Sequence, residues 1–161
     1  MRYILILLLS TMLFGNSYDF DEYKFVSAAS TEFKKSGNIS FDGNKTIITY
    51  SKPKYKQITT DGVNVSMKGS SGKVFNLKGK AQFFTNQFIM IMTKIDEIDE
   101  LKSGRDFDAK KKGDTYTLTF KGEVSDQIIS AEVQTKGSDV LSFKLFMKND
   151  DTLEIVKRWN I

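Results

Sequence analysis

Alternating apolar and polar positions dominate the chain and predict a protein built mainly of β-strands. Apolar residues at every second position are typical of a strand that buries one face and exposes the other. Turn signals recur about every 8–12 residues, which is too short for parallel crossovers and predicts an antiparallel meander. The expected strands span residues 33–41, 46–50, 55–60, 63–67, 74–77, 116–120, 128–133, 141–147 and 153–156.

The period changes in the middle of the chain, where apolar residues recur every three or four positions. This spacing predicts one amphipathic helix over residues 81–102, which Gly104 is expected to end. Its acidic residues fall on the expected solvent side, and carboxylates spread along a helix face do not converge on a cation. The acidic residues are Asp96, Glu97, Asp99 and Glu100.

A sheet of about nine or ten strands must curl, because an open twisted sheet of that size leaves much apolar surface uncovered. The helix has an apolar face that also needs a partner. We therefore expect an α+β fold that is mainly β with one long helix. Its sheet would form a strongly bent, partly open antiparallel barrel, with the helix against the concave side. Pro53 interrupts the pattern and predicts an edge or a bend.

The first seventeen residues have the pattern of a cleavable export signal. Arg2 precedes a short apolar run, and the small residues Gly15 and Ser17 precede a polar, acidic stretch. The apolar run is too short to span a membrane, which takes about 20 residues. We expect cleavage after Ser17 and a single domain over residues 18–161 that works outside the cytoplasm. An uncleaved N-terminal anchor is the alternative.

The chain contains neither cysteine nor histidine, which excludes several kinds of chemistry. Without cysteine it forms no disulfide and carries no lipid-modified N-terminal cysteine. Without histidine it lacks the commonest general base and the usual metal ligand. Paired carboxylates or a Ser–Lys pair are the enzymatic alternative, but no spacing marks such a pair. We therefore expect no catalytic residue, no metal and no cofactor.

The net charge of +4 is mild and is spread along the chain. Lysines gather on both sides of Pro53 and at residues 110–112. Such runs are typical of solvated turns, and without aromatic or motif support they do not indicate nucleic-acid binding. An anionic membrane surface is a more plausible partner for an exported protein.

Asp42, Asn44 and Thr46 resemble the extended bacterial glycosylation sequon and lie at an expected hairpin turn. An unmodified turn is the alternative interpretation of the same residues.

The apolar face of the predicted helix is dense in phenylalanine and methionine, at Phe83, Phe84, Phe88 and residues 90–92. These side chains suit a surface that adapts to flexible acyl chains. The alternative is an ordinary core that fills the concavity of the sheet.

Two stretches of the chain resemble one family. Residues 50–65 carry an aromatic residue, a proline shortly after it, and a strand that ends in Asp61-Gly62 before an alternating strand. Residues 33–41 are similar to the early Phe…Ser-Gly-hydrophobic strand of the same family. In these features the chain resembles the periplasmic outer-membrane lipoprotein carriers, the LolA-like proteins.

The resemblance implies a half-open antiparallel barrel with a helical lid and an apolar cavity that shields acyl chains in the periplasm. Its implied partners are an acylated lipoprotein or another lipid, an inner-membrane donor and an outer-membrane acceptor. We further expect a monomer that has no nucleic-acid partner. Two features depart from the family pattern: residues 44–49 lack the arginine of that strand, and residues 18–30 form a short, mixed segment in place of an N-terminal helix.

We expect apolar side chains of the strands and the helix to line the cavity. The expected lipid-binding residues are Ile39, Phe41, Ile48, Tyr50, Val63, Val65, Met67, Phe84, Phe88, Ile91 and Met92. The alternative is a non-enzymatic protein-interaction module of the cell envelope, with a filled core and a functional edge strand near Pro53. An apolar cavity of about several hundred Å³ would favour the carrier.

Overall fold

A computed structural model of the chain describes residues 17–94, 103–105, 107–137 and 139–158, and it leaves out the side chains of residues 87 and 90–94. Two expectations lie outside the described residues, wholly or in large part. They are the export signal at residues 1–17 and the second half of the predicted helix, at residues 95–102.

The described residues form one antiparallel sheet of 11 strands in the order β6-β5-β4-β3-β2-β1-β11-β10-β9-β8-β7. The strands are β1 (Tyr18–Val26), β2 (Thr31–Asp42), β3 (Lys45–Lys52), β4 (Lys56–Thr60), β5 (Val65–Gly69), β6 (Val74–Asn76), β7 (Phe107–Lys112), β8 (Thr115–Phe120), β9 (Ile128–Lys136), β10 (Asp139–Met147) and β11 (Thr152–Arg158). The predicted antiparallel meander and the mainly β character are confirmed.

One α-helix follows the first six strands. This helix, α1 (Gly79–Lys94), begins two residues before the predicted start. Its residue Ile89 is buried, and Phe83 and Phe88 pack against the core. Two short 3-10 helices, η1 (Ser27–Ala29) and η3 (Gly122–Asp126), complete the described elements. No helix in the described part of the chain is both long enough and apolar enough to cross a membrane.

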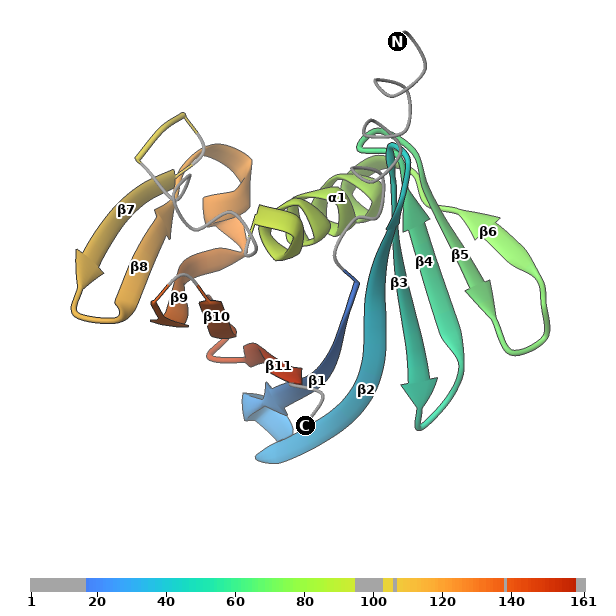
Figure 1. Ribbon diagram of the computed structural model, residues 1–161, viewed down its shortest axis with the longest axis horizontal. Helices are drawn as coiled ribbons and strands as arrows, with labels where there is room; N and C mark the ends of the chain where they lie inside the picture. The colour runs from blue at the N-terminus through green and yellow to red at the C-terminus, as the bar shows by residue number, and fades with distance from the viewer. Residues whose placement is uncertain (1–16, 95–102, 106, 138, 159–161) are drawn as a thin grey trace, which may run out of the picture.

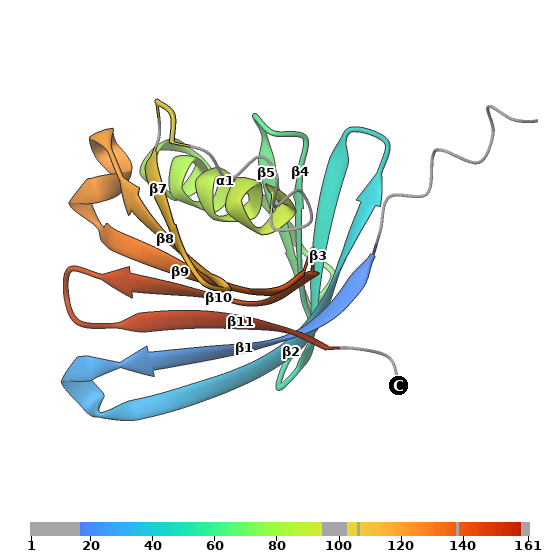
Figure 2. The same cartoon turned by 60° about the vertical axis from the view of Figure 1, so that its left-hand side comes forward.

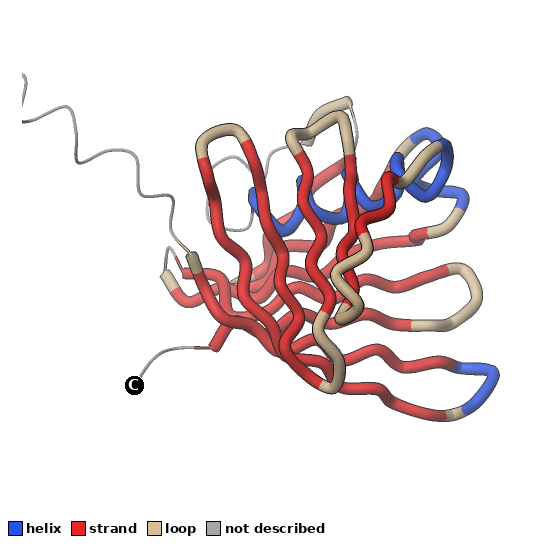
Figure 3. The backbone as a smooth tube through the Cα atoms, turned by 90° about the vertical axis from the view of Figure 1, so that its right-hand side faces the viewer, coloured by secondary structure: helices blue, strands red, loops and turns tan. Residues whose placement is uncertain are grey.

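The sheet consists of two meanders, β1 to β6 and β7 to β11, which the pairing of β1 with β11 joins in the middle (Figure 1). The joined sheet curves around α1, which lies on its concave side (Figure 2). Figure 3 faces β3 to β6 and shows α1 behind these strands. Since β6 and β7 are unpaired edges, the sheet is open and does not close into a barrel.

Side chains alternate between the two faces of the sheet, and the two faces differ in polarity. The concave face is apolar, and its largest fully buried side chains are Phe20, Phe143, Ile39, Ile48, Leu118, Leu145, Val65 and Val133. The convex face is polar. There, for example, Lys34 forms an ion pair with Asp21 at 3.0 Å, and the Ser36 hydroxyl donates to Asp21 at 2.6 Å. The hydrophobic core therefore lies inside the curve of the sheet.

Side chains of α1 attach it to the turn between β4 and β5. The amides of Gln82 and Asn86 both donate to the carbonyl of Val63, at 2.6 and 2.8 Å. The Thr60 hydroxyl donates to the Asn86 Oδ1 atom at 2.6 Å. These bonds place the N-terminal half of the helix over the first meander.

Two strands were not predicted. The segment before the first expected strand has a short, mixed pattern, but it forms β1 across residues 18–26. Its alternation is hard to see because the charged residues Glu22 and Lys24 occupy inward positions next to Phe20. The lysine run at residues 110–112 was interpreted as a solvated turn, but it belongs to edge strand β7. Exposed lysines are common on edge strands, where they discourage pairing with other chains.

Pro53 lies in a bend between β3 and β4. The sequence had predicted either an edge or a bend at this residue, and the bend is confirmed. Both strands are internal to the sheet. An edge strand near Pro53, which the protein-interaction alternative required, is therefore wrong, and the edges are β6 and β7.

A glycine makes room for an aromatic pair at the centre of the first meander. The rings of Phe20 and Tyr50 meet edge to face with centroids 5.6 Å apart. Gly37 lies beneath them on β2, where a Cβ atom would approach the Thr49 carbonyl oxygen to 2.5 Å and the Phe20 ring to 2.9 Å. Any side chain at residue 37 would therefore push this pair apart.

We expect Gly37→Ala to lower the free energy of unfolding by about 1–3 kcal/mol, because it overpacks the core. Gly69→Ala is the matched control, since a Cβ atom there meets nothing within 4 Å. The control should leave stability unchanged or raise it by up to about 1 kcal/mol. Urea unfolding of both variants measures the difference, and equal stabilities would contradict this account of Gly37.

Candidate functional site

A cleft of about 390 Å³ lies between α1 and the concave face of the sheet, and we call it the helix–sheet cleft. Its lining residues are Glu22, Lys24, Lys35, Tyr50, Lys56, Ile58, Phe84, Thr85, Phe88, Gln127, Ile128, Leu145, Met147 and Leu153. The helix contributes two phenylalanines, and both meanders of the sheet contribute apolar side chains. The cleft thus combines an apolar surface with a group of charged side chains.

The charged group is built around a buried carboxylate. The Glu22 side chain is 3% exposed, and its two oxygens have different partners. Tyr50 donates its hydroxyl to the Oε2 atom at 2.6 Å, and the Lys35 ammonium lies 2.9 Å from the Oε1 atom. A buried carboxylate is tolerated when it is both paired and hydrogen-bonded, as here.

Two lysines also approach the Tyr50 ring. The ammonium groups of Lys35 and Lys56 lie 5.5 and 5.6 Å from its centroid, within the range of cation–π attraction. Burial raises the pKa of Tyr50, and the neighbouring Glu22 carboxylate raises it further. Burial lowers the pKa of Lys56, and the positive charge of Lys35 acts in the same direction. Tyr50 therefore keeps its proton and remains a hydrogen-bond donor.

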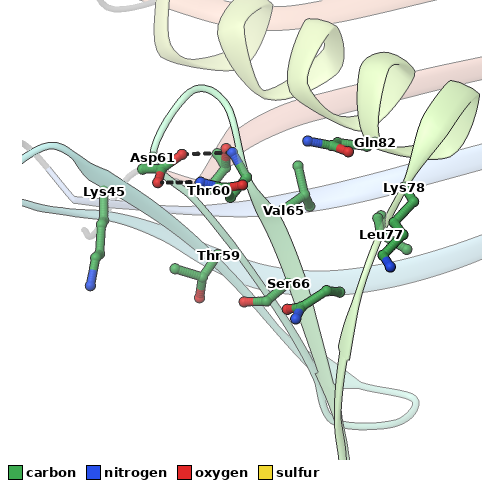
Figure 4. A pocket seen from close by; sticks show the side chains of 11 residues that line it. Lys45, Thr59, Thr60, Asp61, Val65, Ser66, Leu77, Lys78 and Gln82 are labelled. Carbon is green, nitrogen blue, oxygen red and sulfur yellow. Dashed lines mark hydrogen bonds between the residues drawn. The ribbon is translucent and has the colours of Figure 1, made fainter.

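Another cavity, of about 490 Å³, is larger but polar, and it lies at the end of β4, β5 and β6 (Figure 4). Thr59 and Thr60 both line it. Because consecutive strand residues point to opposite faces, this cavity reaches around the sheet and is a surface groove. Val65 and Leu77 are the apolar residues among its lining residues, so it is a poorer candidate for an acyl chain than the helix–sheet cleft.

Asp61 closes the turn beside this groove. It accepts bonds from the Asn64 amide side chain at 3.1 Å and backbone at 2.7 Å, and from the Val63 backbone at 2.9 Å. The Asn64 side-chain bond, followed by the backbone bonds, lowers the pKa of Asp61 to about 2. The carboxylate is fully committed to the turn, so it has a structural role.

Three of the expected lipid-binding residues line the helix–sheet cleft: Tyr50, Phe84 and Phe88. Ile39 and Ile48 lie on the same concave face but are fully buried in the core. They support the wall of the cleft from beneath and do not line it.

The remaining expected residues lie elsewhere. Phe41 and Met67 are partly buried against the core, and Val65 is buried and lines the polar groove. The placement of Val63 in a cavity is wrong: this residue lies in the turn before β5 and is 68% exposed. The side chains of Ile91 and Met92 lie outside the description.

The sequence did not predict that charged side chains, or residues of the second meander, belong to the site. Leu145 and Leu153 lie in expected strands, but only the pairing of β1 with β11 brings them to the cleft. Glu22 and Lys24 alternate with Phe20 along β1. Their spacing of two residues from Phe20 was the signal in the sequence that their side chains face inward.

Among the described residues, no group of three or more acidic, histidine or cysteine side chains is placed to hold a metal ion.

No family model matches the chain, and no curated protein matches it. Several solved structures are similar to it. A DUF1329 family protein from Desulfovibrio piger has a TM-score of 0.44 and 9% identity, over 88% of this chain and 82% of that chain. A LolA superfamily protein from Nitrosomonas europaea has a TM-score of 0.41 and 9% identity, over 89% and 83%. A proposed outer membrane lipoprotein-sorting protein domain from Vibrio parahaemolyticus has a TM-score of 0.40 and 6% identity, over 89% and 83%.

The structural neighbours of the chain thus include LolA superfamily proteins, the group that residues 33–41 and 50–65 resemble in sequence. With identities below 10% and TM-scores below 0.5, the likeness carries no argument about the ligand or the activity of this chain.

We expect Tyr50→Phe to lower the free energy of unfolding by about 1–3 kcal/mol, because it removes a hydrogen bond from buried Glu22. Tyr55→Phe is the matched control, since Tyr55 is 39% exposed and lies outside the cleft; it should change stability by less than about 0.5 kcal/mol. Chemical unfolding at neutral pH measures both. Equal effects of the two variants would remove Tyr50 from the support of the carboxylate.

The pH dependence of stability provides a second readout. The pKa of Tyr50 is raised in the folded protein, so its contribution is complete below the unfolded value of about 10 and is lost as pH rises above it. We expect the wild-type protein to lose more stability than Tyr50→Phe between about pH 9 and 11. Parallel curves for the two proteins would contradict the raised pKa.

Proposed function

We propose that the protein is a non-enzymatic carrier that shields an acyl chain in the helix–sheet cleft. The observation that supports this function is the position of the cleft between a phenylalanine-bearing helix face and the apolar face of the sheet. Its volume of about 390 Å³ falls within the range of about 300–1,000 Å³ typical of ligand pockets. Each buried methylene of a bound chain would contribute about 0.8 kcal/mol.

The carrier works in the periplasm, after removal of residues 1–17. Its cargo is the acyl part of a lipoprotein or another lipid, taken from an inner-membrane donor and passed to an outer-membrane acceptor. The resemblance of residues 33–41 and 50–65 to lipoprotein carriers agrees with this assignment. The protein acts as a monomer and binds no nucleic acid.

In this proposal α1 is the lid of the cleft. Its polar attachments described above are at Gln82 and Asn86, both to the β4–β5 turn. In the same turns of the helix, Phe84 lies between these two residues and Phe88 just beyond them, and both meet the cleft through apolar side chains. Apolar contacts have no directional requirement, so α1 can tilt about its attached end and admit a chain.

The alternative function is a protein-interaction module of the envelope, and edge strand β6 favours it. Val74 and Phe75 on this strand are 58% and 53% exposed. An exposed, apolar edge can pair with a strand of another protein. The two functions differ in where a disruptive substitution acts, in the cleft or on β6.

We expect Thr85→Trp to reduce the affinity for a fluorescent palmitate analogue at least about tenfold, because a bulky ring would occupy the cleft beside Phe84 and Phe88. Phe88→Asp should have the same effect, since a carboxylate would face the chain. Ile129→Asp is the control, because Ile129 is 51% exposed and does not line the cleft. It should bind as the wild type does.

Fluorescence titration measures the affinity, and thermal unfolding shows whether each variant is folded. Native mass spectrometry of protein from the periplasm identifies any acylated cargo. A folded Thr85→Trp variant that binds with wild-type affinity would contradict the assigned cleft.

A further inference from the structure

The helix–sheet cleft has an excess of positive charge. Lys24 on β1, Lys35 on β2 and Lys56 on β4 line it, and Glu22 is the acidic residue among its lining residues. The ion pair between Lys35 and Glu22, at 2.9 Å, neutralises one lysine. Within the described part of the chain, neither Lys24 nor Lys56 forms an ion pair. Two positive charges therefore face the cleft without a carboxylate partner.

These two lysines differ from Lys34 and Lys144 of the convex face, which both have carboxylate partners. There Lys34 pairs with Asp21 at 3.0 Å, and Lys144 lies 3.7 Å from Glu154. Solvated lysines on a polar face cost little, whereas a cation turned toward an apolar cleft loses hydration. Packing of the sheet alone does not account for unpaired lysines at Lys24 and Lys56.

Lys56 is partly buried in the cleft. Its pKa is lowered mainly by burial and then by the neighbouring Lys35 charge, with Glu22 opposing the shift only as the smallest cause. Its ammonium group also lies 5.6 Å from the centroid of the Tyr50 ring. An anion entering the cleft would restore a partner to Lys56 and stabilise its charged form.

The apolar half of the same cleft lies within reach of these cations. Lys24 is opposite Leu153 in the pairing of β1 with β11, and Leu153 lines the cleft with Leu145. Lys56 is two residues from Ile58 on the same face of β4, and Ile58 also lines the cleft. One ligand with a charged end and an apolar chain can therefore contact both surfaces.

We propose that the helix–sheet cleft binds an anionic amphiphile, with a phosphodiester headgroup held by Lys24 and Lys56 and the acyl chain against Ile58, Leu145, Leu153 and the phenylalanines of α1. The selectivity for negative headgroups rests on the proposed carrier function, because the chain must enter the same cleft. Glu22 holds Lys35 beside Tyr50 and leaves the two other lysines to the ligand.

The test compares three probes of matched chemistry by isothermal titration calorimetry. Palmitoyl-lysophosphatidylglycerol carries a negative headgroup, palmitoyl-lysophosphatidylcholine carries the same chain on a zwitterionic headgroup, and glycerophosphoglycerol is the negative headgroup without a chain. All three are kept below their micellar concentrations. We expect the wild-type protein to bind the first probe about tenfold more tightly than the second, with a preference that shrinks as salt is added.

The double variant K24Q/K56Q should lose this preference, so that the two lysolipids bind with similar affinity. K68Q/K110Q is the matched control, because it removes the same charge from exposed lysines that do not line the cleft, and it should keep the preference. Thermal unfolding confirms that both double variants are folded.

Each result decides the proposal. Equal wild-type affinities for the two lysolipids, or a preference that survives in K24Q/K56Q, would overturn the headgroup site and leave the carrier function standing. Binding of glycerophosphoglycerol as tight as that of its lysolipid would mean that free phosphate esters are the ligand, and would overturn the amphiphile. Failure of both lysolipids to bind would overturn the carrier function together with the headgroup site.

Discussion

The apolar face of the 11-stranded sheet sets the constraint on which the rest of the structure depends, because one helix is too small to cover it. A flat sheet of this width would leave most of that face in water, at a cost of about 25 cal/mol per Å². The sheet instead curves around α1, so that the inner faces of both meanders share one hydrophobic core with the helix. The pairing of β1 with β11 makes this curvature continuous, since it joins the meanders at their first and last strands. The helix–sheet cleft is the space that remains between a curved sheet and a single helix.

One side of the cleft is charged, where Glu22, Lys24, Lys35 and Lys56 line it. Glu22 is buried and requires partners, which Tyr50 and Lys35 supply from β3 and β2. These bonds connect three neighbouring strands through side chains, in addition to their backbone pairing. Such a network is stable only when every member is satisfied. Lys24 and Lys56 have no carboxylate partner in this network, so they are the lysines that remain available for a ligand.

The strands with clear alternation and the change to a helical period were predictable from the sequence. Strand β1 was not, because inward Glu22 and Lys24 obscure its apolar positions, and edge strand β7 was not, because exposed lysines fill its second half. The site was predicted in part. Tyr50, Phe84 and Phe88 follow from local periodicity, whereas Leu145 and Leu153 reach the cleft only through strand pairing between the two ends of the domain. Periodicity gives the face on which a residue lies, and long-range pairing decides which faces meet.

The proposed carrier function requires release of the cargo as well as binding, and the composition of the cleft bears on this balance. Burial of about ten methylenes would contribute about 8 kcal/mol, which corresponds to a dissociation constant of about 1 μM before the costs of association. Those costs, about 4–15 kcal/mol, would consume much of that gain. A cleft of about 390 Å³ is at the lower end of the range of ligand pockets, so chain burial alone supports only modest affinity. In the proposed headgroup site, the charges of Lys24 and Lys56 would then set both the affinity and the choice of lipid. Since they act through electrostatics that solvent screens, an opening movement of α1 that admits water would weaken the headgroup contact and the chain contact together.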